Sequence, residues 1–133
     1  MRRRDVRRNA FTLLFQLGFT DNEEEAKRIF FEEAEMELTQ SEKDFILKTV
    51  MGVRENTEKI DEFINSVAKK WDTKRMANVD LAILRLAVYE LKFDTETPAS
   101  VVINEAVELA KEYSSDGSPA FVNGILGKLV KNF

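Results

Sequence analysis

Hydrophobic residues surround almost the whole circumference of one segment, residues 78–93 (NVDLAILRLAVYELKF). On a period of 3.6 residues its aliphatic and aromatic side chains cover most directions, which is typical of a helix enclosed by other helices. The segment is too short and too charged to cross a bilayer, which needs about 20 mainly apolar residues. We therefore expect the central helix of an all-helical core, with Arg85 and Glu90 as charges at its rim, each finding a partner on another element.

Six other segments carry an apolar stripe at helical spacing, so the sequence predicts about seven helices and no strand. Two capping boxes, Thr20 with Glu23 and Thr39 with Glu42, are expected to open the second and third helices. The predicted helices cover about 6–19, 23–37, 39–54, a fourth ending near 68, the central 78–93, 101–113, and a last one opened by Ser118 as N-cap and Pro119 in the first turn.

Three single residues carry structural expectations. Trp71 is expected to anchor the connection before the central helix onto that helix, in preference to an exposed stacking role. Gly124 and Gly127 lie three positions apart inside the last helix. Their lack of a side chain predicts close approach of another backbone.

Composition excludes several kinds of chemistry. The 133 residues include no Cys and no His. Disulfides, thiolate nucleophiles, the commonest general base and the commonest transition-metal ligand are therefore missing. The acidic run at residues 23–25 is expected to be a solvated helix face, not a metal site, because adjacent helical residues point in different directions. We expect one domain with no catalytic residues, no metal and no cofactor. No signal peptide is recognisable, which predicts a cytoplasmic protein with no membrane association.

The net charge of −4 hides a strong asymmetry. Residues 1–8 (MRRRDVRR) hold five Arg and one Asp, a local balance of +4. The other 125 residues hold 15 basic and 23 acidic side chains, a balance of −8. A basic arm on an acidic body is typical of nucleic-acid-binding proteins, although a solubilising tail has the same pattern.

The first predicted helix aligns basic and aromatic residues. Arg4, Arg8, Phe11 and Phe15 are spaced 4, 3 and 4 apart and so share one helix face, with Arg7 beside them. Arginine neutralises phosphate and aromatic rings stack on unpaired bases, so this face suits single-stranded nucleic acid. The alternative is that the two phenylalanines form a second core stripe and the arginines a solvated helix end. For the phenylalanines taken alone, this alternative is the stronger interpretation.

Longer motifs in the second half resemble a known family. The segments are WDTKRMANVDLAILRLAVYEL at 71–91, PASVVINEAVELAKEY at 98–113 and FVNGIL at 121–126, combined with the arginine-rich first helix. Together they resemble the NusB family of bacterial transcription antitermination factors over nearly the whole chain. The resemblance implies an all-α fold in which a three-helix half (1–70) packs on a four-helix half (71–133).

The same resemblance implies a non-enzymatic function. Members of the family bind the boxA element of ribosomal RNA leader transcripts together with ribosomal protein S10. The resulting complex joins other Nus factors on RNA polymerase and suppresses premature termination. A related domain occurs in ribosomal RNA cytosine methyltransferases, but the chain shows no glycine-rich cofactor loop after a strand. A helical adaptor or homodimer that does not use RNA is the remaining alternative, and it should ignore boxA RNA.

The family's binding residues can be transferred position by position. The implied protein-partner residue, for S10, is Asp80. Relatives commonly have Tyr at the position of Phe15, Lys at that of Ala120, and an acidic or amide residue at that of Gly127. The implied RNA-binding residues are Arg2, Arg3, Arg4, Arg7, Arg8, Phe15, Phe121, Val122 and Asn123.

Overall fold

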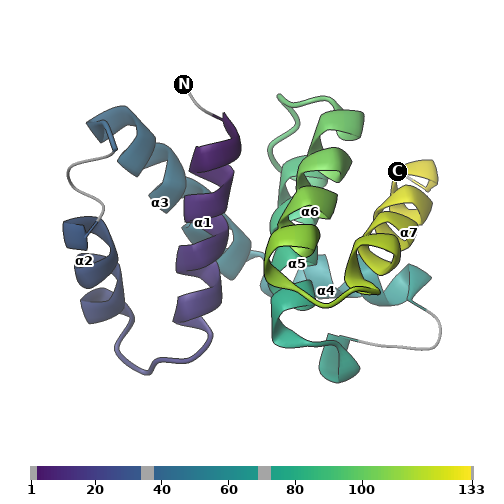
Figure 1. Ribbon diagram of the computed structural model, residues 1–133, viewed down its shortest axis with the longest axis horizontal. Helices are drawn as coiled ribbons and strands as arrows, with labels where there is room; N and C mark the ends of the chain where they lie inside the picture. Colours follow the sequence, from purple (N-terminus) through teal and green to yellow (C-terminus); the bar gives the residue numbers. More distant parts are fainter. Residues whose placement is uncertain (1–2, 34–37, 69–72, 133) are drawn as a thin grey trace. The chain divides into compact units, whose positions relative to one another are not determined.

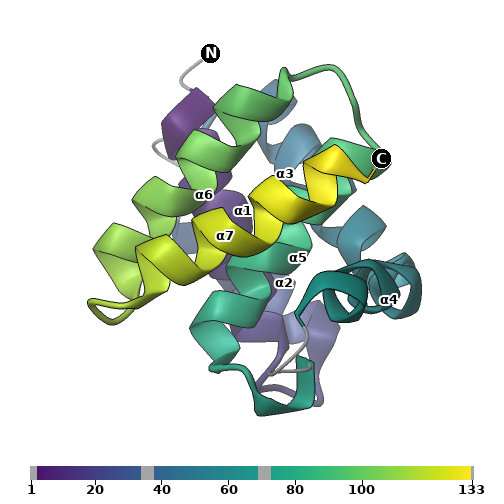
Figure 2. The same ribbon diagram turned by 90° about the vertical axis from the view of Figure 1, so that its right-hand side faces the viewer.

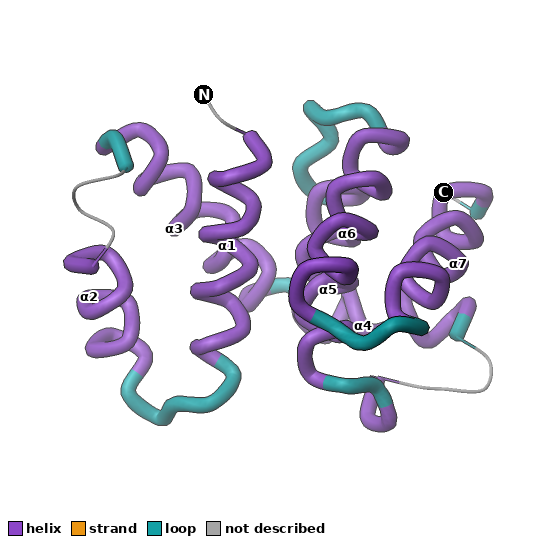
Figure 3. The backbone as a smooth tube through the Cα atoms, in the orientation of Figure 1, coloured by secondary structure: helices purple, strands orange, loops and turns teal. Residues whose placement is uncertain are grey.

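Helices account for all the regular structure that the computed structural model describes, which comprises residues 3–33, 38–68 and 73–132 (Figure 3). Seven α-helices and one short 3-10 helix occur in these ranges, and none of these residues forms a strand. The all-α prediction is confirmed. The elements are α1 (Arg3–Leu17), α2 (Glu23–Glu33), α3 (Gln40–Glu55), α4 (Thr57–Val67), η1 (Thr73–Arg75), α5 (Asn78–Lys92), α6 (Ala99–Tyr113) and α7 (Ser118–Lys131).

The chain divides into two compact units, residues 1–52 and 53–133. The first unit contains α1, α2 and most of α3, and the second contains the end of α3 and α4 to α7 (Figure 1). The expected halves divide between residues 70 and 71, so they would place α4 with the first three helices. In the first unit α1 packs against α2. The predicted core stripe of α1 is buried throughout, at Val6, Ala10, Leu13, Leu14 and Leu17.

Helix α5 is the centre of the second unit. It contacts α4, α6 and α7, and α7 runs beside α6 as well (Figure 2). Ten of its fifteen residues are buried, and Ile83, Leu84 and Val88 are completely inaccessible to solvent. Within this unit, the prediction of a helix surrounded by other helices is therefore confirmed.

The two charges expected at the rim of α5 differ in their surroundings. Arg85 is half-buried and forms a two-pronged pair with Asp61 of α4, in which its Nε and Nη2 donate to the carboxylate over 2.9 and 2.7 Å. This pairing confirms the expected partner on another element. Glu90 is only 6% exposed, so the prediction that it lies at the rim is wrong. The charge of Glu90 did not indicate that its side chain is buried.

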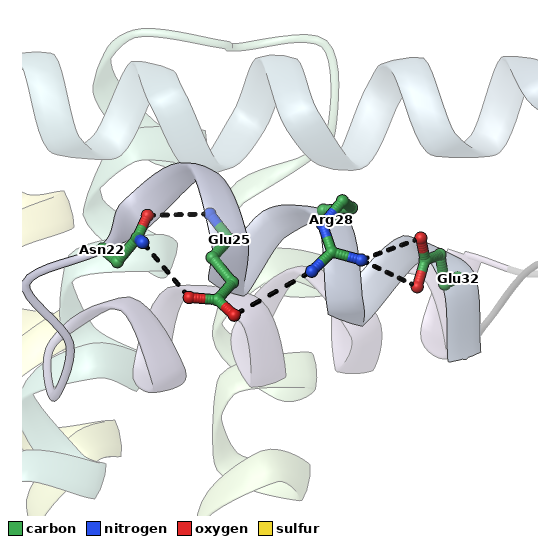
Figure 4. A network of polar contacts seen from close by, with 4 residues as sticks. All are labelled: Asn22, Glu25, Arg28 and Glu32. Carbon is green, nitrogen blue, oxygen red and sulfur yellow. Dashed lines mark hydrogen bonds and ion pairs between the residues drawn. The ribbon is translucent and has the colours of Figure 1, made fainter.

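The helix caps show where local signals were sufficient. Thr39 and Glu42 form the expected reciprocal box, with the Glu42 N–H donating to Thr39 Oγ1 over 3.1 Å and the Thr39 N–H to Glu42 Oε1 over 2.9 Å. The box before α2 is instead formed by Asn22 and Glu25 (Figure 4). Asn22 is as good an N-cap as Thr20, and its amide reaches both the Glu25 N–H and the Glu25 carboxylate, each over 3.1 Å.

The remaining single-residue predictions have different outcomes. A Cβ added at Gly124 or Gly127 would meet no atom within 4 Å, so the predicted close approach of a backbone is wrong. The absence of a side chain in a helix therefore does not mark a contact here. Trp71 lies outside the described residues. The expected end of α2, near residue 37, also lies outside the described residues. For the other helices, predicted and observed ends agree within a few residues.

We expect Leu84→Ala to lower the free energy of unfolding by about 2–5 kcal/mol, because it leaves a cavity beneath a completely buried side chain. Urea unfolding followed by circular dichroism measures this loss. Val101→Ala, at a position 40% exposed in the same unit, is the control and should change stability by only about 0.5 kcal/mol. Equal, small losses for both variants would show that α5 is not the core helix.

Candidate nucleic-acid interface

The basic and aromatic line on α1 begins in solvent and ends partly in the core. Arg4 is exposed, Arg8 is about one-third exposed, and Phe15 is half-buried. Phe11 is only 3% exposed, so it belongs to the core, as the alternative interpretation required. The helical spacing did not indicate which of these side chains other residues cover. The accessible part of the line consists of Arg4, Arg8 and Phe15.

Hydrogen bonds within α1 fix the position of Arg8. Its Nη1 donates to Asp5 Oδ1 over 3.2 Å, and its backbone carbonyl accepts from the Thr12 hydroxyl over 2.9 Å. Asp5 therefore offsets part of the Arg8 charge and also complements the positive end of the helix. Arg7 is only 6% exposed, so little of its side chain is available to a ligand in this conformation. Arg2 lies outside the described residues, and Arg3 is the first residue of α1.

Three phenylalanine rings follow one another along the end of α1. The Phe11 and Phe15 rings are stacked, with centroids 6.0 Å apart, and the Phe15 and Phe19 rings meet edge to face at 5.0 Å. Phe19 is not among the residues predicted from the sequence, because the predicted line ended at Phe15. The signal was present, since Phe19 is four residues beyond Phe15 and continues the same spacing.

The start of α7, in the second unit, contains the other predicted RNA-binding residues. Asn123 is exposed and Phe121 is half-buried, so both have accessible surface. Val122 is completely buried and is a core residue of α7. Its assignment as a direct contact is therefore corrected, since its neighbours in the FVNG motif face outward while it faces the core.

Asp80 joins the start of α5 to the turn between α6 and α7. Its carboxylate accepts hydrogen bonds from the Ser114 hydroxyl over 2.7 Å and from the Ser118 hydroxyl over 3.0 Å, and the carboxylate is buried. The predicted N-cap role of Ser118 is wrong, because Gly117 is the N-cap residue of α7 and the Ser118 hydroxyl serves Asp80 instead. Pro119 lies in the first turn, as expected.

A small hollow beside Asp80 brings two predicted site residues together. Its lining includes Arg75, Met76, Asp80 and Phe121. Asp80 was predicted for a protein partner and Phe121 for RNA, and within this unit both border the same depression. The described residues contain no cluster of three acidic side chains placed to hold a metal ion. In the same ranges, every helix is too short or too polar to cross a membrane.

Comparison with known proteins gives a consistent result. The model of the NusB family matches residues 4–131. The chain belongs to the NusB family. Two curated relatives named transcription antitermination protein NusB come from Agathobacter rectalis and Acetivibrio thermocellus. The first is 44% identical and covers 96% of this chain and 98% of the relative. The second is 46% identical, and the alignment covers 98% of this chain and 90% of the relative.

Solved structures of the family share the fold. A structure of T. maritima NusB is 37% identical, covers 98% of this chain and 92% of its own, and superposes with a TM-score of 0.87. A crystal structure of the antitermination factors NusB and NusE in complex with dsRNA is 26% identical, covers both chains completely, and has a TM-score of 0.86. The fold of the described helices is thus that of NusB proteins.

We expect Asp80→Ala to lower the free energy of unfolding by about 1–3 kcal/mol, because two serine hydroxyls lose their acceptor and one of them is buried. Thermal unfolding followed by circular dichroism measures the effect. Asp116→Ala is the matched control, since this carboxylate lies exposed in the α6–α7 turn and should matter little. Equal stability of the two variants would remove Asp80 from the structural role described above.

Proposed function

We propose that the chain is a transcription antitermination factor that binds single-stranded boxA RNA of ribosomal RNA leader transcripts together with ribosomal protein S10. Family membership supports the general role, because the curated relatives carry the name transcription antitermination protein. A related NusB has been crystallised with NusE, which is ribosomal protein S10, and with double-stranded RNA. The observation that carries the proposal in this chain is the accessible Arg4, Arg8 and Phe15 face of α1.

The two accessible arginines supply the attraction to RNA. An α-helix rises 1.5 Å per residue, so the Cα atoms of Arg4 and Arg8 lie about 6 Å apart along α1. This separation lets two guanidinium groups meet neighbouring phosphates of one strand. Each neutralised phosphate releases condensed counterions, which favours binding at low salt. Arginine also forms two parallel hydrogen bonds with a phosphate group, which lysine cannot do.

Phe15 supplies the preference for an unpaired strand. A ring stacks on a base only when the base is not already enclosed in a duplex, so an accessible ring beside arginines favours single-stranded RNA. Phe15 lacks the hydroxyl of tyrosine and therefore contributes by stacking alone. At the start of α7, Asn123 offers an amide that can pair with a base edge, and Phe121 offers part of a second ring. Ala120 places no positive charge there.

The partner side of the proposal concerns Asp80 and the hollow that it borders. S10 is proposed to bind near this hollow, and the complex is proposed to join other Nus factors on RNA polymerase. Asp80 acts there by holding the α6–α7 turn in place through Ser114 and Ser118, because its own carboxylate is buried. The function requires no bond-making step and is therefore proposed to be non-enzymatic.

Replacing Arg4 and Arg8 together by Ala should flatten the slope of log affinity against log salt by about 1.4, since each phosphate contact on a single strand adds about 0.7. Fluorescence anisotropy with labelled boxA RNA at several salt concentrations gives the slope. The control is a double variant, Arg28→Ala with Arg54→Ala, which removes the same charge from exposed positions on α2 and α3. Binding by the wild type with equal slopes for both double variants would end the case for the α1 face. A wild-type chain that ignores boxA RNA would instead support an adaptor or a homodimer.

S10 and boxA RNA should each tighten the binding of the other by about 5–150-fold, because coupling between linked sites is typically 1–3 kcal/mol and reciprocal. Titration of RNA with and without S10, and of S10 with and without RNA, measures both directions. Asp80→Ala should weaken S10 binding while leaving the helical signal at 25 °C intact, and Asp116→Ala should leave S10 binding unchanged. Unaltered S10 affinity in Asp80→Ala would remove Asp80 from the partner site.

A further inference from the structure

Phe19 is the most exposed of the large hydrophobic residues that the structure describes. It is 62% exposed and lies in the turn that follows α1. The turn is well defined, because the Phe19 N–H donates to the Gln16 carbonyl over 3.1 Å and the Gly18 N–H to the Phe15 carbonyl over 3.2 Å. A Cβ at position 18 would lie 3.3 Å from that Phe15 carbonyl oxygen, so a larger residue there would crowd the turn. The backbone thus holds an aromatic ring in water.

The ring of Phe19 packs against the ring of Phe15. Its edge-to-face contact with Phe15, at 69° and 5.0 Å, continues a series that starts with the buried ring of Phe11. The series runs from the core to the surface, so Phe11 anchors Phe15, and Phe15 in turn orients Phe19. Because the ring is already held in place, a ligand that stacks on it loses little conformational entropy on binding.

The exposed ring lies just beyond the end of the helix that carries the accessible arginines. Phe19 lies two residues beyond Leu17, the last residue of α1, and its ring contacts that of Phe15, which shares a helix face with Arg8. At 1.5 Å per residue, Phe15 lies about 10 Å beyond Arg8 along the helix. A strand whose phosphates meet Arg4 and Arg8 is thereby directed toward the two rings. The positive charge beside them favours a negatively charged ligand with flat apolar parts, which describes an unpaired nucleotide strand.

We propose that Phe19 is a second base-stacking residue, which takes the base next to the one stacked on Phe15. The planes of the two rings are inclined at 69°, so they suit two successive bases that are splayed apart, as in single-stranded recognition, and not two bases stacked on each other. This inference rests on the proposed RNA binding by α1. It adds a specific nucleotide contact to it and gives the strand a direction, from the arginines toward the end of the helix.

The test compares Phe19→Leu with Phe19→Trp. Leucine keeps an apolar side chain but removes the aromatic plane, so affinity for labelled boxA RNA should fall by about 5–150-fold, the range for one stacked base. Tryptophan keeps the plane and should bind at least as tightly as the wild type. The salt slope should stay the same in both variants, because no charge is lost. Ile29→Ala, at an exposed apolar position of α2, is the control and should not change affinity.

A second measurement identifies the base. A series of boxA RNAs, each lacking one base, is titrated against the wild type and against Phe19→Leu. Removal of one particular base should lower the affinity of the wild type but should not lower the affinity of Phe19→Leu further. The contact between this base and Phe19 is already absent in that variant. Phe15→Leu should show the same coupling to an adjacent position. Thermal unfolding should be unchanged in Phe19→Leu, since the ring covers little of the core.

The outcomes separate the two proposals. If the wild type binds boxA RNA with the salt slope that Arg4 and Arg8 explain, but Phe19→Leu binds equally well, then the inference about Phe19 is wrong and the proposed function stands. If the wild type does not bind, both fail. Sedimentation of the wild type and of Phe19→Leu tests whether the Phe19 ring contacts a second copy of the chain instead of RNA. A dimer that becomes a monomer in Phe19→Leu, at unchanged RNA affinity, would also overturn the inference.

Discussion

The burial of α5 among α4, α6 and α7 is the constraint on which the second unit depends. A helix covered on nearly all sides leaves little solvent for its polar side chains, so neighbouring helices must satisfy them. Arg85 therefore draws its partner from α4, and Asp80 draws two hydroxyls from the α6–α7 turn. These bonds fix where the neighbouring helices stand along α5. They also set where α7 begins, and with it the positions of Phe121 and Asn123.

Much of this fold follows from the sequence because the deciding signals are local. The apolar stripe of α1 and the circumferential pattern of α5 identify their helices without knowledge of any neighbour. The box formed by Thr39 and Glu42 needs only their spacing. The same rule failed before α2, because Thr20–Glu23 and Asn22–Glu25 have equal spacing and spacing alone cannot choose between them.

The candidate site was less predictable, because exposure is a property of tertiary packing. Arg4 and Phe15 were found from their helical direction, but the same direction also selected Phe11, which the core covers. Ser118 looked like a cap in its own segment, whereas its hydroxyl is used by Asp80, 38 residues away in the chain. No local pattern contains such a long-range bond. For Gly124 and Gly127 the error was of another kind, since a missing side chain permits a close contact without requiring one.

The charge distribution determines how much the arginines and the aromatic rings of the proposed interface each contribute to RNA affinity. Outside residues 1–8 the chain carries 23 acidic and 15 basic side chains, so most of its surface repels RNA. Repulsion and attraction both act over about one Debye length, roughly 10 Å at 0.1 M salt, so a strand is directed to α1 only when it is already near. Rising salt weakens the arginine contacts and the repulsion together, but it leaves ring stacking almost unchanged. In the proposed interface, Phe15 and Phe19 would therefore carry a growing share of the affinity as ionic strength increases, and the arginines would mainly determine where the strand first meets the protein.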